Sequence, residues 1–253
     1  DVCSSDLSSR ESLDCALALQ ELVSMGVDNI ITFDAHDPRV QNAIPLSGFE
    51  TVRPTYQFIK GLLRTVPDLI IDSDHMMAIS PDEGGTSRAV YLANVLGLDM
   101  GMFYKRRDYT QIVDGRNPIV AHEFLGSSVE GKDVIIIDDM ISSGDSIIDV
   151  ATELKRRKAK RIFAAATFGL FTNGLDKFDK AYEEGIIHGI LTTNLIYQTP
   201  ELLSRPYYIN CDLSKYIALL IDTLNHDGSI SSILSPNERI QHVVQKYKNG
   251  EPI

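Results

Sequence analysis

The fold is decided by one stretch of the sequence, Val134-Ile135-Ile136-Ile137-Asp138-Asp139-Met140-Ile141-Ser142-Ser143-Gly144-Asp145-Ser146. It opens with four β-branched apolar residues, the pattern of a strand buried on both faces. Two carboxylates and a short Ser/Gly loop follow. Apolar residues then recur with helical spacing at Ile147, Ala151 and Leu154. Because a second apolar run comes next, at 161–167, the stretch predicts a strand–helix–strand unit with parallel strands.

The loop between this strand and its helix has the composition of a sugar-phosphate site. Open parallel sheets bind ligands beyond the carboxyl ends of their strands, and a Ser/Gly loop entering a helix offers N–H donors to a phosphate. The expected phosphate contacts are Ser142, Ser143, Gly144 and Ser146, and the expected contacts to a vicinal diol or a metal are Asp138 and Asp139. The simpler alternative is a buried strand, an acidic turn and a capped helix.

Three details of the loop lead to structural expectations. Glycine at 144 would let the backbone approach the anion. The spacing of Ser146 and Asp149 is that of a capping box at the start of the helix. Asp145 would repel a phosphate if it faced one, so we expect its side chain to turn away and bond the helix N-terminus or solvent.

Composition sets the broad class of protein. The 253 residues are 43% hydrophobic and 23% charged, as in a globular protein of one or two domains. A net charge of −11 argues against a nucleic-acid partner. The absence of an apolar run of about 18 residues predicts no membrane span. The three cysteines, Cys3, Cys15 and Cys211, lack metal-ligand spacing and favour a cytoplasmic location.

The beginning of the chain is unusual. Asp1–Leu7 reads like a translated adapter oligonucleotide, and there is no initiator Met. We therefore set these residues aside and expect a fragment that lacks its natural beginning. A polar acidic stretch near residues 72–74 predicts a domain boundary. The expected division is 1–72 as the end of one domain, 73–226 as a second domain and 227–253 as a C-terminal tail.

Two further polar loops are expected beyond strand ends. Asp34-Ala35-His36-Asp37 follows a predicted strand at 29–33, and its histidine between acids is a metal or phosphate candidate. Ser80-Pro81-Asp82-Glu83-Gly84-Gly85 lies between a predicted strand at 75–79 and a helix at 87–96. Its two glycines alone would indicate only a tight turn.

A basic cluster follows the next predicted strand, 100–104. Lys105-Arg106-Arg107 would compensate phosphate charge if it stands at the strand's end, and otherwise it is a solvated surface patch. The segment 108–130 has no clear period and predicts either a lid or an excursion of β-structure.

The remaining chain alternates strands with helices. Helices are predicted at 9–26, 56–64, 175–184 and 213–224, and strands at 186–191 and 207–210. Five strands alternating with helices from residue 75 onward predict a mainly parallel α/β sheet.

Four loops, in this order, resemble those of ribose-phosphate diphosphokinase, also called phosphoribosyl-diphosphate (PRPP) synthetase. They are the loops at His36, Asp82, Lys105-Arg106-Arg107 and Asp138-Asp139. The last also resembles the PRPP motif of type I phosphoribosyltransferases. The chain departs from the family pattern at Ser142 (usually Asp), Asp145 (usually Gly) and Phe168 (usually His).

The resemblance implies a fold, a reaction and residue roles. The fold would be α/β with a parallel sheet of the type I phosphoribosyltransferase kind, comprising a complete C-terminal domain and the end of a similar N-terminal domain. The reaction would join ATP and ribose 5-phosphate to give PRPP and AMP, with Mg²⁺ as cofactor, in a homo-oligomer such as a hexamer. The implied roles are catalysis by Lys105 and Arg107, ATP and metal binding by His36, metal binding by Asp82, and sugar-phosphate binding by Asp138, Asp139 and the 142–146 loop.

Two alternatives stay open at this stage. A phosphoribosyltransferase would consume PRPP with the same loop, but would not need the His36 segment or the basic cluster. A non-catalytic regulatory homologue would keep the fold and lose contacts. The three departures at Ser142, Asp145 and Phe168 are consistent with that last alternative.

Overall fold

The chain folds into two compact units that divide after Pro54. The computed structural model describes residues 13–107 and 119–253, the side chains of 105–107 and 119–122 excepted. None of the helices in these described ranges is long and apolar enough to cross a membrane.

The first unit is a small α/β arrangement. It contains helix α1 (Asp14–Ser24), strand β1 (Asn29–Phe33), the 3-10 helix η1 (Pro38–Ala43) and strand β2 (Gly48–Val52). The two strands pair in parallel, with Asn29 opposite Gly48 and Phe33 opposite Val52. The strand predicted at 29–33 is confirmed at its stated bounds, and the predicted helix at 9–26 is present from Asp14 onward.

The second unit is built on a seven-stranded sheet. Its order is β5-β4-β3-β6-β7-β8-β9, and every neighbouring pair is parallel except β4 and β5. This confirms the predicted mainly parallel sheet. The antiparallel strand β5 lies within the segment 108–130, for which the sequence predicted either a lid or an excursion of β-structure. The second of these two expectations is therefore met at Ile119–Leu125. The strands are β3 (Met76–Ser80), β4 (Asp99–Arg107), β5 (Ile119–Leu125), β6 (Asp133–Ile141), β7 (Arg161–Gly169), β8 (Gly189–Thr193) and β9 (Tyr208–Cys211).

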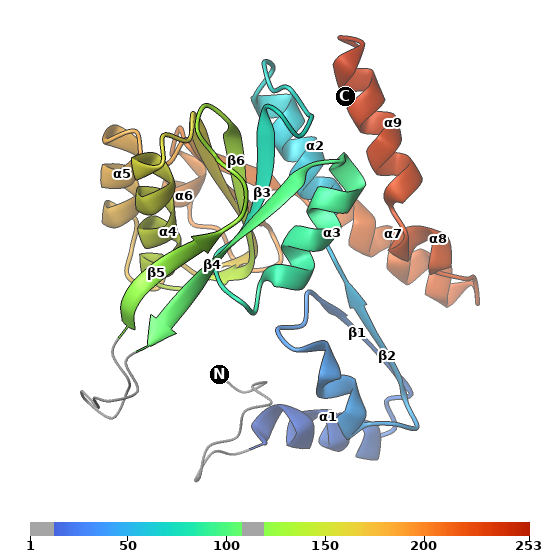
Figure 1. The fold of residues 1–253 in the computed structure, drawn as a ribbon. Helices are drawn as coiled ribbons and strands as arrows, with labels where there is room; N and C mark the ends of the chain where they lie inside the picture. Colours follow the sequence, from blue (N-terminus) through green and yellow to red (C-terminus); the bar gives the residue numbers. More distant parts are fainter. Residues whose placement is uncertain (1–12, 108–118) are drawn as a thin grey trace. The chain divides into compact units, whose positions relative to one another are not determined.

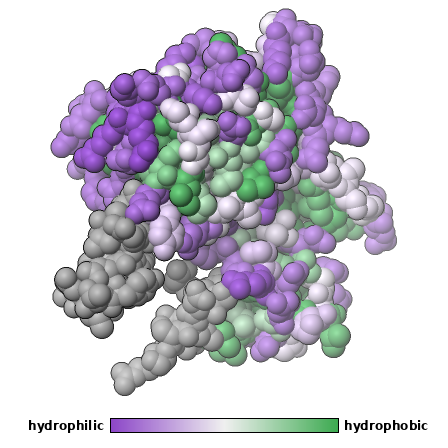
Figure 2. Space-filling model, in the orientation of Figure 1, coloured by the Kyte–Doolittle hydropathy of each residue, from purple (hydrophilic) through white to green (hydrophobic). Residues whose placement is uncertain are grey.

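Helices cover both faces of this sheet (Figure 1). Helices α2, α3 and α9 pack on one face, and α4 and α5 pack on the other. The surface over α4 and α5 is mostly hydrophilic, as expected for helices with one buried face (Figure 2). The helices are α2 (Thr55–Thr65), α3 (Thr86–Leu96), α4 (Asp145–Arg156), α5 (Asp176–Glu183), α6 (Pro200–Leu203), α7 (Ser214–Asn225), α8 (Ser231–Leu234) and α9 (Asn237–Lys248).

Strand β6 joins the two layers of the core. Ile135 and Ile137 point into the layer formed with α2, α3 and α9, whereas Val134 and Ile136 point into the layer formed with α4 and α5. Successive side chains of a strand alternate between faces, so a strand buried on both sides needs a continuous apolar run. The Val-Ile-Ile-Ile run therefore requires β6 to lie in the interior of the sheet.

The compact units divide at a different place from the domains expected from the sequence. Helix α2 lies before the expected boundary at residue 72, yet it packs against β9, β8 and α9 of the second unit. The physical reason is its apolar face, which buries Phe58, Ile59, Leu62 and Leu63 in the sheet's core. The acidic stretch near residue 72 is a surface turn within the second unit.

The segment 227–253, expected as a tail, contributes to the core. Helix α9 packs against α2 and α3 and buries Ile240, Val243 and Val244. Tyr247 adds two bonds, because its hydroxyl donates to the carbonyl of Val66 at 2.8 Å and accepts from the Leu69 N–H at 2.7 Å. The helix thus closes one face of the sheet.

We therefore expect Ile240→Ala to lower the free energy of unfolding by about 2–5 kcal/mol, the usual range for emptying a buried aliphatic site. The measurement is equilibrium denaturation by urea. His242→Ala is the matched control, since His242 is exposed on the same helix, and a change within about 0.5 kcal/mol is expected there. Equal effects of the two substitutions would show that α9 is not part of the cooperative core.

Candidate active site

The candidate site lies where β3 and β6 end side by side. Pairing between these strands stops at Ile79 opposite Ile136. Pairing of β6 with β7 continues further, to Ile141 opposite Gly169. Asp138 and Asp139 therefore lie inside β6, held by β7 on one side and released from β3 on the other. The sequence had placed them after the strand, and they fall within it because β7 extends the ladder.

The two adjacent carboxylates repel each other in a poorly solvated place. Asp139 is 3% exposed, and its N–H donates to Oδ1 of Asp138 at 2.9 Å. Burial raises the pKa of the Asp138 carboxyl to about 8, with further contributions from Asp139 and from Asp82. Burial therefore favours the protonated form of Asp138 at neutral pH.

A buried arginine faces the second carboxylate. Nη2 of Arg88, on α3, lies 3.9 Å from Oδ2 of Asp139, and both side chains are almost fully buried. Sequence reasoning missed Arg88. The sequence feature that could have indicated Arg88 is its position. It is a charged residue one helical turn before Leu92, on the apolar face of α3 that also buries Ala89. A buried cation beside an acid pair offsets one of the two negative charges.

The loop after β3 approaches the same place. The Ser80 hydroxyl donates to the carbonyl of Asp82 at 2.6 Å, and the Gly85 N–H donates to Oδ1 of Asp82 at 3.3 Å. A side chain at 85 would come within 2.9 Å of Ser80 Oγ and 3.4 Å of the Ile137 carbonyl. A side chain at 85 would therefore crowd Ser80, and glycine lets the loop lie close to β6. Asp82 lies near enough to the acid pair to influence the pKa of Asp138, whereas the roles that the family resemblance implies for these residues stay predictions.

The Ser/Gly loop after β6 differs in detail from the sequence-based expectation. Helix α4 begins at Asp145, with Gly144 as its N-cap and no side-chain cap bond, so the predicted Ser146–Asp149 capping box is wrong. Gly144 has φ +83°, and an added Cβ would lie 2.1 Å from the ring of Phe178. The described structure thus gives Gly144 a packing role, because α5 presses an aromatic ring against it.

Asp145 forms bonds on the side of α5. Its carboxylate pairs with Lys177 and accepts from the Ser143 hydroxyl at 2.9 Å. These two contacts hold the pKa of Asp145 below its usual range. The expectation that it bonds helix amides or solvent was therefore incomplete, since Lys177 neutralises it. Lys177 lies outside the motif, and nothing in the local sequence indicated that it would reach the loop.

The basic cluster lies within strand β4 rather than beyond its end. Lys105, Arg106 and Arg107 pair with His122, Ala121 and Ile119 of β5, which extends the strand past the predicted limit. Its neighbour β3 ends earlier, because Ser80 is opposite Met102. The backbone of the cluster therefore continues roughly 10 Å beyond the end of β3, on the side of the Asp82 loop. A lid was the other expectation for 108–130, and residues 108–118 of that segment lie outside the described residues.

The His36 loop belongs to the first compact unit. His36 is exposed, and Asp37 accepts a bond from the Arg39 N–H at 2.9 Å and forms an ion pair with its guanidinium. Asp34 is buried with φ +45°, so the chain turns sharply after β1. In the part of the chain that the structure describes, no group of three or more His, Cys, Asp or Glu is arranged to hold a metal. The implied metal roles of His36 and Asp82 thus stay predictions.

Comparison with known proteins assigns the family. The model of the family described as "Phosphoribosyl transferase domain" matches residues 58–187. Ribose-phosphate pyrophosphokinase of Pasteurella multocida is 30% identical over 231 residues, and that of Vibrio parahaemolyticus is 29% identical over 235. In both cases the match covers 90% of this chain and 68% of the relative. For the Mycoplasma pneumoniae protein of the same name, 28% identical, the shares are 88% and 64%.

The fold agrees with these relatives. The crystal structure of phosphoribosylpyrophosphate synthetase from Mycobacterium smegmatis superposes with a TM-score of 0.71 at 22% identity, covering 87% of this chain and 66% of that one. The chain spans about two thirds of the length of the proteins that it matches. With the acid pair, the Asp82 loop and the parallel sheet, these matches show that the chain belongs to the phosphoribosyl transferase domain family and, within it, to the ribose-phosphate pyrophosphokinases.

Proposed function

We propose that the protein transfers the diphosphoryl group of Mg-ATP to O1 of ribose 5-phosphate, giving PRPP and AMP. The anomeric hydroxyl oxygen attacks the β-phosphorus and loses its proton. The bond from the β-phosphorus to the oxygen bridging it to the α-phosphorus breaks, and AMP leaves with that oxygen. No covalent intermediate on the protein is needed, so the protein's part is positioning and charge compensation.

One observation supports this reaction above the others: the Asp82 loop lies beside the Asp138–Asp139 pair at one edge of the sheet. A sugar-phosphate loop alone fits any PRPP-binding protein. A second acidic loop beside it fits an enzyme that must also place a metal-bound polyphosphate next to the sugar. The relatives named ribose-phosphate pyrophosphokinase support the same reading.

The proposed roles follow from where each group lies. Asp138 and Asp139 would accept hydrogen bonds from the two ribose hydroxyls, and the helix start at 142–146 would hold the 5′-phosphate with backbone N–H groups. The Ser143 hydroxyl already donates to Asp145, so a phosphate would compete with that carboxylate for its proton. Ser142 and Ser146 are the other hydroxyls of this loop that we propose to contact the phosphate.

Carboxylate oxygens are the ligands that Mg²⁺ prefers, usually one or two of them with substrate phosphates. Asp82 would hold the ion in the second unit, and the family resemblance assigns a metal and ATP role to His36 as well. When bound, the ion would neutralise charge on the phosphates. Lys105 and Arg107 would stabilise the negative charge that develops on the transferred group. We also propose, from the family, a cytoplasmic homo-oligomer such as a hexamer.

The deciding experiment is an assay of the intact protein for AMP release from Mg-ATP and ribose 5-phosphate. A parallel assay supplies PRPP with a purine or pyrimidine base and measures nucleotide formation. AMP release with PRPP as co-product supports the proposal. Nucleotide formation without AMP release would identify a phosphoribosyltransferase. Neither product, in a folded protein that binds ribose 5-phosphate, would identify the regulatory homologue.

The basic cluster gives the first kinetic prediction. Lys105→Ala or Arg107→Ala should lower kcat by about 10²-fold and change the KM for ribose 5-phosphate far less, since the charge they would stabilise grows in the transition state. Steady-state kinetics of AMP release measures both constants. Lys180→Ala, an exposed cation on α5, is the control and should leave both unchanged. An unaltered kcat in the Lys105 and Arg107 variants would show that the basic cluster is a solvated surface patch.

The acid pair gives a prediction on stability. In the unfolded chain the Asp138 carboxyl loses its proton near pH 3.8, whereas in the folded chain it keeps the proton up to about pH 8. Between these values the folded state binds more protons, so stability falls as the pH rises. Asp138→Asn removes the titrating carboxyl and therefore removes this loss of stability.

We therefore expect the stability advantage of Asp138→Asn over the parent to grow from pH 5 to pH 8, by at most about 1.4 kcal/mol per pH unit, and to level off above pH 8. Thermal denaturation of both proteins across this range is the measurement. The same variant should bind ribose 5-phosphate more weakly by titration calorimetry. A stability difference that does not depend on pH would contradict a protonated, buried Asp138.

A further inference from the structure

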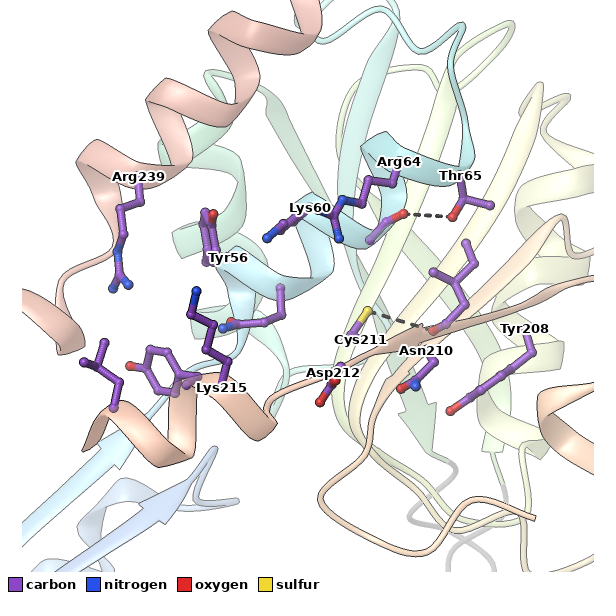
Figure 3. Close-up of a pocket in the computed structure, with 15 residues that line it drawn as sticks. Tyr56, Lys60, Arg64, Thr65, Tyr208, Asn210, Cys211, Asp212, Lys215 and Arg239 are labelled. Carbon is purple, nitrogen blue, oxygen red and sulfur yellow. Dashed lines mark hydrogen bonds between the residues drawn. The ribbon is translucent and has the colours of Figure 1, made fainter. Parts of the chain in front are cut away.

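A cavity lies away from the acid pair, between α2, β9, α7 and α9. Its volume is about 510 Å³, enough for a ligand of sugar-phosphate size. It lies at the lateral edge of the sheet that β9 forms, and β9 is separated from β6 by β7 and β8. Three strand spacings place it roughly 14 Å from β6. Figure 3 shows the residues that line this cavity, which we call the β9 cleft.

The β9 cleft gathers positive charge in an acidic protein. Its lining includes four cations, Lys60, Arg64, Lys215 and Arg239, and one carboxylate, Asp212. The whole chain carries a net charge of −11. The cations come from three different helices, α2, α7 and α9. Helices that are distant in sequence thus place like charges around one hollow, which costs free energy unless something negative occupies it.

Within the part of the chain that the structure describes, the lining carboxylate Asp212 forms no ion pair with these four cations. Oδ1 of Asp212 accepts hydrogen bonds from Asn194 Nδ2 and from the Ser214 N–H, both at 2.8 Å. Among the described residues, neither Lys60 nor Lys215 forms an ion pair. Burial, together with Arg64 and Lys215, lowers the pKa of Lys60. Lys60 and Lys215 therefore have no carboxylate partner in the described chain, and they are repelled by the other cations of the β9 cleft.

An aromatic ring fixes two of the cations. Lys60 Nζ and the Arg239 guanidinium carbon lie 5.8 Å and 5.5 Å from the centroid of Tyr56, and in Figure 3 Tyr56 lies between them. Arg239 also donates to the carbonyl of Ile233 at 2.8 Å. Arg64 is held at another point by its bond to the Ile253 main-chain oxygen at 3.0 Å. These contacts pre-position the charges, which lowers the entropic cost of binding an anion.

We propose that the β9 cleft binds a small phosphorylated anion carrying about three negative charges, as a diphosphate group does. Four cations and one carboxylate leave an excess of three positive charges, which such a group would balance. Arginine and lysine are the usual ligands of phosphate oxygens. The inference stands apart from the proposed transfer reaction. Two of the cations, Lys215 and Arg239, also lie outside the matched family segment 58–187.

The test uses the full chain and inorganic pyrophosphate as the probe, by titration calorimetry at low ionic strength. EDTA excludes metal-dependent binding at the carboxylates of the candidate active site. The cleft variant is Lys60→Gln with Lys215→Gln. The matched control is Lys160→Gln with Lys180→Gln, two exposed lysines outside the β9 cleft with the same change of charge. A third variant, Ser142→Ala with Ser146→Ala, alters the proposed phosphate loop.

We expect the parent and the charge control to bind pyrophosphate alike, and the cleft variant to bind it at least about tenfold more weakly, since each lost charged contact is worth roughly that factor. Three results would overturn the proposal. The first is that the cleft variant binds pyrophosphate as tightly as the parent does. The second is that the loop variant alone loses binding. The third is that the parent does not bind pyrophosphate at about 1 mM.

Stability provides an independent readout of the same site. Without pyrophosphate, the cleft variant should melt at or above the temperature of the parent, because like charges are removed. With pyrophosphate, the parent's melting temperature should rise and the variant's should not. If the double variant does not fold, the single Lys215→Gln replaces it, since Lys215 is exposed on α7. Equal stabilisation of parent and variant by pyrophosphate would place the anion elsewhere.

Discussion

The structure depends on the parallel pairing of strand β6 with β3 on one side and β7 on the other. The strand is apolar on both faces, so it must lie between two layers of helices. Its two ladders end at different points, with β3 leaving at Ile136 and β7 continuing to Ile141. The backbone is thus still held rigidly where Asp138 and Asp139 occur, while one side is open to the Asp82 loop. A rigid element that carries the functional groups is what a binding site requires.

That arrangement places two acids where charge is costly. Burial and the nearness of Asp139 and Asp82 keep a proton on Asp138, and the buried Arg88 faces Asp139. The chain gives up stability at neutral pH at this edge of the sheet, and a ligand or cation that bonds both acids would recover it. Local violations of folding rules of this kind are expected at functional sites.

The Ser/Gly loop shows how a departure from the family pattern is accommodated. A carboxylate at 145 would oppose a phosphate, but Lys177 on α5 pairs with it and Ser143 donates to it. The same helix α5 places Phe178 against Gly144. One neighbouring helix thus neutralises the added charge and restricts the loop's glycine. The substitution is therefore compatible with a phosphate-binding loop, in a geometry that the pairing with α5 controls.

The sequence by itself determined the parallel α/β class, the order of the polar loops and most of the helices and strands. Periodicity and apolar runs report directly on burial, which is why β6 and α2 could be predicted. Only the tertiary structure decided the strand ends around Asp138 and Lys105, because a strand continues as long as a neighbour supplies backbone partners. The roles of Arg88, Lys177 and α9 were also decided there. Their partners lie far away in the sequence, and contacts over such separations leave no local pattern.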